Sequence, residues 1–170
     1  VQKSLMNVCL YISFFPQLIA GPIVRYQTFD DQITTRRETL DDFCEGIRRF
    51  IVGLAKKVLL ANNLAALADT AFAMQTTELS LVGTWLAAAS YMLQLYFDFS
   101  GYSDMAIGLA RMFGFHLLEN FNLPFIARSI AGFWKRWHIS LTSWFRDYLY
   151  FPLGGSRVSK GRLLFNMGVV

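Results

Sequence analysis

The feature that most constrains the fold is a run of 19 residues without a charged side chain, Leu79–Phe97, which lies between Glu78 and Asp98. A helix needs about 20 predominantly apolar residues to cross the hydrocarbon core of a bilayer. The whole chain is 54% hydrophobic and only 16% charged, whereas about a quarter of the residues in a soluble domain are charged. We therefore predict an all-α, polytopic integral membrane protein in which Leu79–Phe97 is the clearest span.

Two further stretches are apolar enough to be considered as spans. Leu5–Val24 has the length, but Pro16 and Pro22 should interrupt or kink a helix there. An interrupted helix at membrane depth is tolerated where it lines a cavity or packs on protein. Val58–Met74 is the weaker of the two, because it contains two asparagines and an aspartate.

An amphipathic helix is expected to begin after Thr39, which can cap it, and to continue into the stretch after Val58. Its apolar positions recur at helical spacing, and its basic residues fall outside that stripe. The stripe comprises Phe43, Ile47, Phe50, Ile51, Leu54 and Val58, and the basic residues are Arg48, Arg49, Lys56 and Lys57. This pattern predicts a helix at the membrane interface.

The net charge of +4 comes from bases that are grouped in the hydrophilic segments. In a membrane protein this grouping indicates positive-inside topology, and no soluble basic domain is present to bind nucleic acid. Cys9 and Cys44 form no spacing motif, which disfavours a disulfide framework, a zinc site and a cysteine nucleophile. Because the chain opens on Val1 and ends on a short apolar run, we interpret it as the middle of a longer polytopic protein.

The most informative stretch, Gly132–Gly155, combines aromatic residues, paired bases and the single histidine His138. Without proline or glycine between Phe133 and Phe151, it is expected to form one helix of about six turns. On that helix Trp134, His138, Leu141 and Phe145 share one face, and Arg136, Ser140, Ser143 and Asp147 share another. Two interpretations follow for His138: a structural histidine in an aromatic core, or an active-site residue.

The stretch after Asp98 contains Asp104 and Arg111, which are seven residues apart and therefore lie on one side of a helix. An ion network between them is the simpler interpretation, and a catalytic or proton-carrying carboxylate is the alternative. His116 precedes a predicted turn at Glu119–Phe125 and is expected to be a loop or interface residue.

Four blocks in this order resemble the membrane-bound O-acyltransferases (MBOAT), in particular the bacterial alginate O-acetylation branch, with the D-alanyl transferase of teichoic acid synthesis as a relative. The blocks are FFPQLIAGPIVRYQ at 14–27, LQLYFDFSGYSDMAIG at 93–108, ENFNLPF at 119–125 and FWKRWHISLTSWFRDYLYFPLGG at 133–155. The resemblance implies the MBOAT fold, a helical bundle around a central funnel or tunnel, with interrupted and interfacial helices. Residues 1–170 would be the central part of one such domain, incomplete at both ends.

The resemblance also implies that His138 is catalytic and that a second histidine follows downstream, in a GLWHG-like motif that this sequence does not contain. Possible supporting or donor-binding residues are Trp134, Lys135, Arg136, Trp137, Ser140, Asn122 and Asp104. For Lys135 and Arg136, anchoring at the membrane interface is an equal alternative. No metal and no bound cofactor are expected.

The implied reaction moves an acyl group, which the resemblance suggests is acetyl, from a thioester donor to a hydroxyl. The donor would be acetyl-CoA or an acyl-phosphopantetheine carrier on the cytoplasmic side. The acceptor would be an extracytoplasmic polysaccharide or a partner protein, such as a periplasmic acetyltransferase, at the bacterial inner membrane. Two alternatives remain: a transporter with Asp98, Asp104 and His138 as a proton relay, and a non-catalytic scaffold for periplasmic transferases.

Overall fold

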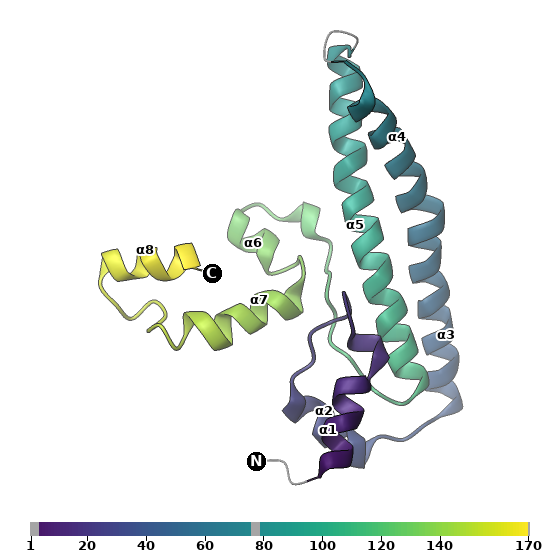
Figure 1. The fold of residues 1–170 in the computed structure, drawn as a ribbon, viewed down its shortest axis with the longest axis vertical. Helices are drawn as coiled ribbons and strands as arrows, with labels where there is room; N and C mark the ends of the chain where they lie inside the picture. The colour runs from purple at the N-terminus through teal and green to yellow at the C-terminus, as the bar shows by residue number, and fades with distance from the viewer. Residues whose placement is uncertain (1–3, 76–78, 170) are drawn as a thin grey trace. The chain divides into compact units, whose positions relative to one another are not determined.

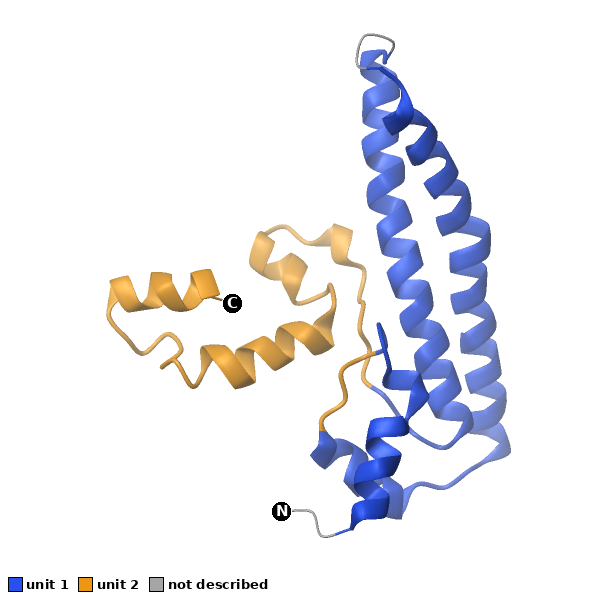
Figure 2. Cartoon of the chain, viewed as in Figure 1, with its two compact units in different colours: residues 1–21, 26–117 blue, residues 22–25, 118–170 orange. Residues whose placement is uncertain are grey.

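The computed structural model describes residues 4–75 and 79–169, and the described residues contain helices and no strand (Figure 1). The chain divides into two compact units (Figure 2). Unit 1 comprises residues 1–21 and 26–117, and unit 2 comprises residues 22–25 and 118–170. The all-α prediction is therefore confirmed for the described residues.

The first apolar stretch is interrupted, as predicted. Helix α1 (Leu5–Ser13) has nine residues, which is too short to span a bilayer. It stops at Phe14, and the 3₁₀ turn η1 (Phe15–Gln17) follows with Pro16 inside it. The Phe14 ring packs against Phe29 of α2 (Tyr26–Thr35) and against Phe115, so the interruption inserts an aromatic side chain into the core of unit 1.

The longest continuous apolar helix runs from Leu40 to Ala73. It consists of α3 (Leu40–Ala55), the π-helical segment η2 (Lys56–Ala61) and α4 (Asn62–Ala73). Thr39 caps it, as predicted, because its side chain accepts the backbone N–H of Asp42 at 3.1 Å.

Among residues 4–75 and 79–169, this 34-residue helix is the one that is long and apolar enough to cross a membrane. The ranking of spans in our prediction was therefore wrong. Leu79–Phe97 mostly falls in the first half of α5 (Leu81–Met112), where Thr84, Ser90 and Gln94 lower the mean hydropathy.

Helix α5 runs without a break past Asp98 and packs along α3, η2 and α4 (Figure 1). Glycines allow the two backbones to come close at two levels. A Cβ atom built on Gly46 would lie 2.6 Å from the carbonyl oxygen of Gly108, and one built on Gly53 would lie 2.6 Å from that of Gly101. Close approach through small residues is the usual way in which helices associate in membranes.

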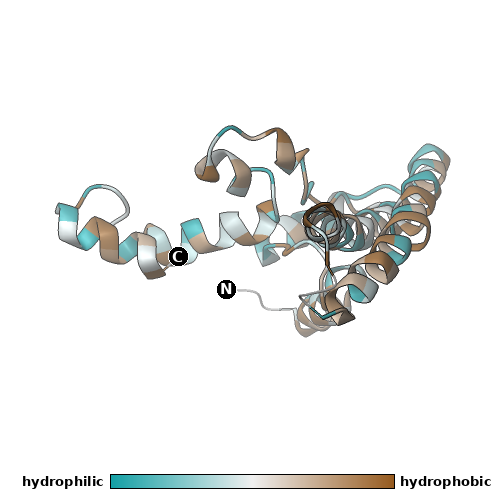
Figure 3. Cartoon of the chain, turned by 90° about the horizontal axis from the view of Figure 1, so that it is seen from above, coloured by the Kyte–Doolittle hydropathy of each residue, from teal (hydrophilic) through white to brown (hydrophobic). Residues whose placement is uncertain are grey.

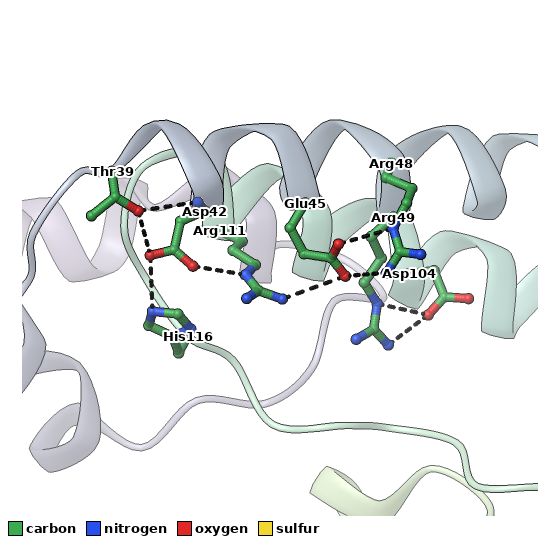
Figure 4. Close-up of polar contacts among 8 residues, drawn as sticks. All are labelled: Thr39, Asp42, Glu45, Arg48, Arg49, Asp104, Arg111 and His116. Atoms are coloured by element: carbon green, nitrogen blue, oxygen red, sulfur yellow. Dashed lines mark hydrogen bonds and ion pairs between the residues drawn. The ribbon is translucent and has the colours of Figure 1, made fainter.

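Charged side chains pair across the same contact, which we call the α3–α5 seam (Figure 4). Asp104 accepts from Arg49 at 2.8 Å and from Lys56 at 2.6 Å, and Asp98 pairs with Lys57. Arg111 donates to Asp42 at 3.0 Å. Asp104 and Arg111 are thus both ion-paired, as the simpler interpretation predicted. Their partners lie on the preceding helix, because α3 and η2 bring the complementary charges to α5.

The apolar stripe of α3 faces outward, and two of the basic residues that fall outside the stripe face α5. Phe43, Ile47, Ile51 and Leu54 are all exposed in the chain. Arg49 and Lys56 instead face the carboxylates of α5, while Arg48 pairs with Glu45 on α3 itself. Figure 3 shows that hydrophobic residues recur along the helices, and many of the large ones are exposed. Apolar side chains outside and paired charges inside are typical of a helix pair in lipid.

The described residues of unit 2 form four short helical elements, and side-chain contacts tie some of these to other segments. The elements are the 3₁₀ turn η3 (Pro124–Ile126), α6 (Ile130–Trp134), α7 (Ile139–Phe145) with its π-helical extension η4 (Arg146–Tyr150), and α8 (Lys160–Val169). Arg25 forms an ion pair with Asp147, which attaches the 22–25 segment to η4. Asn166 donates to the carbonyls of Leu153 and Gly155, which attaches α8 to the turn that precedes it.

Gly53→Ala should destabilise the full-length protein, because its methyl group would meet the backbone at Gly101 and Met105 within 2.7 Å. We expect a loss of about 1–3 kcal/mol, the usual range for overpacking, measured as a lower thermal midpoint in detergent. Gly161→Ala is the matched control, since a methyl group there would meet no atom within 4 Å apart from its chain neighbours and the backbone of its own helix. Equal midpoints for the two variants would contradict the close approach.

Asp104→Asn keeps the shape of the side chain but leaves Arg49 and Lys56 without their shared counter-charge. We expect stability to fall by about 1.5–3 kcal/mol, the range for hydrogen bonds to charged groups, again read from the thermal midpoint. Asp69→Asn, at an exposed position of α4, is the control and should change nothing. A stable Asp104→Asn protein would show that the seam does not depend on this carboxylate.

Candidate active site

The segment 120–122 lies alongside the chain between α6 and α7 and pairs with its backbone. The N–H of Asn122 donates to the carbonyl of Arg136 at 2.9 Å, and the N–H of Ile139 donates to the carbonyl of Asn120 at 2.9 Å. The Arg136 guanidinium also donates to the carbonyl of Asn122 at 3.1 Å. These three bonds fix residues 136–139 against a segment that is far away in the sequence.

This pairing breaks the helix that the sequence predicts over residues 133–151. Helix α6 ends at Trp134 and α7 begins only at Ile139, with His138 at a left-handed φ of 44°. The prediction of one continuous helix, with Trp134, His138, Leu141 and Phe145 on one face, was therefore wrong. Backbone groups that a regular helix would use internally bond instead to Asn120 and Asn122.

The His138 ring is held by the side chain of Asn120. Nδ1 of His138 lies 3.0 Å from Oδ1 of Asn120. The same oxygen accepts the backbone N–H of Ser140 at 3.2 Å and the Ser140 hydroxyl at 2.9 Å. Asn120 is 1% exposed and Ser140 is 5% exposed, so this cluster is shielded from solvent.

Partial burial lowers the pKa of His138 below its usual value near 6.5, because the charged imidazolium loses solvation. The residue lies between helices of five and seven residues, which are too short to span a membrane. At neutral pH the ring is therefore neutral, and one of its nitrogens can accept a proton.

Aromatic packing beside His138 involves Trp137 more than Trp134. The Trp137 ring stacks on Phe133 with centroids 5.6 Å apart and meets Phe121 edge-on at 5.0 Å. Trp134 is 49% exposed. The rings of Phe121 and Phe133 thus form an aromatic cluster around Trp137, the residue that precedes His138.

The predicted supporting residues have different surroundings in the structure. Ser140 joins the Asn120–His138 cluster, and Arg136 bonds the backbone of the 120–122 segment. Lys135 and Asn122 are exposed. Asp104 belongs to unit 1, where it is part of the α3–α5 seam.

Sequence reasoning missed Asn120, although it singled out Asn122 two positions later. The two residues share the block ENFNLPF, and nothing in their types distinguishes the buried amide from the exposed one. His116, expected in a loop, does lie in one, with its side chain 59% exposed and Nε2 3.9 Å from Asp42 (Figure 4). The described residues contain no group of three or more histidine, cysteine, aspartate or glutamate side chains that could hold a metal ion.

The model of the membrane-bound O-acyltransferase family, MBOAT, matches residues 2–170. The chain belongs to this family. Its membership confirms the resemblance found in the four sequence blocks. Family membership also agrees with the ion pairs between α3 and α5 and with the many exposed apolar side chains.

Named relatives within this family act on different acceptors. The chain is 53% identical over 156 residues to the probable alginate O-acetylase AlgI of Pseudomonas aeruginosa, covering 92% of this chain and 30% of the relative. It is 45% identical over 158 residues to the peptidoglycan O-acetyltransferase of Helicobacter pylori, covering 91% and 30%. It is 36% identical over 155 residues to the teichoic acid D-alanyltransferase of Bacillus subtilis, covering 88% and 38%. The chain thus spans about a third of the length of these curated relatives.

Proposed function

We propose that this chain carries part of the active site of a membrane-embedded O-acyltransferase in which His138 is the general base. The observation that carries the proposal is the fixed imidazole, because Nδ1 of His138 is anchored on Asn120. Burial lowers the pKa of the ring, which favours its base form. Family membership supplies the reaction class.

The reaction needs a base for the acceptor hydroxyl and exclusion of water from the thioester. His138 takes the hydroxyl proton while the oxygen attacks the thioester carbonyl carbon. The carbon–sulfur bond then breaks, and the imidazolium returns its proton to the departing thiolate. The products are an ester and a free thiol, and the histidine ends neutral. A second histidine elsewhere in the full protein can share this proton transfer.

Acetyl is the acyl group that we propose, because two of the three relatives described above are named for O-acetylation. The donor is acetyl-CoA or an acyl-phosphopantetheine carrier, with Lys135 and Arg136 as candidate contacts for its phosphates. The acceptor is a polysaccharide or a partner periplasmic transferase at the bacterial inner membrane. The relatives' names cover alginate, peptidoglycan and teichoic acid. What these acceptors share is an extracytoplasmic hydroxyl group, and this is the acceptor group that we propose.

The structure offers less support for a proton-coupled transporter. That alternative needs Asp98 and Asp104 as proton carriers, but both carboxylates form ion pairs, with Lys57 and with Arg49 and Lys56. Ion pairs across a helix contact give both carboxylates a structural role, which the alternative does not need.

His138→Ala in the full-length protein should lower acyl transfer about 10²–10⁴-fold, the usual contribution of a general base. The assay incubates the protein in lipid nanodiscs with a labelled acetyl thioester and follows thiol release and labelling of a hydroxyl acceptor. His116→Ala is the matched control and should keep the parent rate. Full transfer by His138→Ala would exclude the proposed role, and absence of thiol release by the parent protein would favour a transporter or a scaffold.

The acidic limb of the pH profile of transfer should be centred below about pH 6.5, the reference pKa of histidine. The reason is that burial lowers the pKa of His138. The base form is the active one, so transfer should rise with pH through this lowered pKa and then level off. The measurement is kcat/KM for the parent protein between pH 4.5 and 8, with the stability of the protein followed in parallel. A limb centred above 6.5 would contradict a base whose pKa is lowered by burial.

A further inference from the structure

We infer that Asn120 is a positioning residue that fixes the tautomer of His138, so that Nε2 is the nitrogen that accepts the substrate proton. Asn120 touches the histidine and not the reacting atoms. For its effect on catalysis the inference rests on the proposed function, but the tautomer itself can be measured without any assay of transfer.

The first step is the orientation of the Asn120 amide. The backbone N–H of Ser140 can only donate, and it points at the amide atom 3.2 Å away. That atom must therefore be the oxygen. The Ser140 hydroxyl, at 2.9 Å, donates to the same atom. A rotated amide would place its NH₂ group against the Ser140 N–H, donor against donor.

The second step is the state of the imidazole. An amide oxygen has no proton to give, so Nδ1 of His138 must carry the proton in the 3.0 Å bond to Asn120. In the neutral ring the other nitrogen, Nε2, then holds the lone pair. Asn120 thereby selects one of two tautomers that are close in energy in the free side chain.

The third step is the rigidity of the support. The carbonyl of Asn120 accepts the N–H of Ile139 at 2.9 Å, so the backbone and side chain of one residue hold His138 and the two residues that follow it. The buried Nδ2 of Asn120 has no hydrogen-bond partner among the described residues. A buried donor without a partner is destabilising, whereas the side-chain oxygen of the same residue has three hydrogen-bond contacts.

Ring-¹⁵N-histidine NMR of the full-length protein in nanodiscs tests the tautomer directly. The His138 signals are assigned by their loss in His138→Gln. At neutral pH we expect a protonated Nδ1 and an unprotonated Nε2 in the parent, and a mixture of both tautomers in Asn120→Ala. Asn63→Ala, on the exposed face of α4, is the matched control and should leave the spectrum unchanged. A protonated Nε2 in the parent, or an unchanged tautomer in Asn120→Ala, would overturn the inference.

Kinetics provide the second readout. Asn120→Ala should lower kcat about 10- to 100-fold, as is common when the partner that orients an imidazole is lost, with little change in KM. Asn120→Asp should restore the acceptor and move the acidic limb of the pH profile to higher pH, because a carboxylate favours the imidazolium. Ser140→Ala should loosen the amide and lower kcat less, whereas Ser143→Ala, which loses only a bond to the carbonyl of Ile139, should not.

The two claims fail in different ways. If His138→Ala retains full transfer while the NMR tautomer follows Asn120, the general-base assignment is wrong and the positioning of the ring stands. If His138→Ala is inactive while Asn120→Asp leaves the limb of the pH profile in place, Asn120 does not control the base. A purely structural role of Asn120 would reduce the amount of folded protein without moving that limb.

Discussion

Polar groups that lie inside this chain must find their partners inside it, because much of its exterior is apolar. The α3–α5 seam meets this requirement with charges: two cations share Asp104, and Arg111 reaches back to Asp42. Breaking one member of such a set leaves a charge without compensation, which is far more costly than the pair is worth in water. The four glycines of the seam let the two backbones approach closely beside these ion pairs.

Unit 2 meets the same requirement with neutral groups. The single oxygen of Asn120 accepts from His138 and from the backbone and hydroxyl of Ser140. Its hydrogen bonds turn His138 out of the helical path and into a left-handed conformation, which few residues other than glycine and asparagine adopt without support. The local strain and the reactive side chain therefore coincide, as they often do at functional sites.

Much of unit 1 could be predicted from the sequence because its signals are local. The Thr39 cap, the helix that continues past Val58 and the break at Phe14–Pro16 all follow from caps, periodicity and proline. The direction of the α3 stripe could not be predicted, since an amphipathic helix pattern does not say whether its polar face meets water or another helix. Nor could the partners of Asp104, which come from a helix about fifty residues earlier in the chain.

The site itself was only half predictable. The residue His138 and the family could be read from short motifs, but the helix break around it depends on hydrogen bonds from segment 120–122, and no local propensity signals them. For the same reason Asn120 was missed and its exposed neighbour Asn122 was chosen. Tertiary hydrogen bonds can override helix propensity. Here they interrupt the helix at His138 and hold the residue in the site.

The central claim is that His138 lies outside regular helix and is bonded through Nδ1 to Asn120. The most direct test is a cryo-electron microscopy structure of the full-length protein in nanodiscs, at a resolution that shows side chains. Our account predicts that α6 and α7 are separate there, with Nδ1 of His138 about 3 Å from Oδ1 of Asn120. A continuous helix through residues 133–151, with the His138 ring away from Asn120, would contradict it.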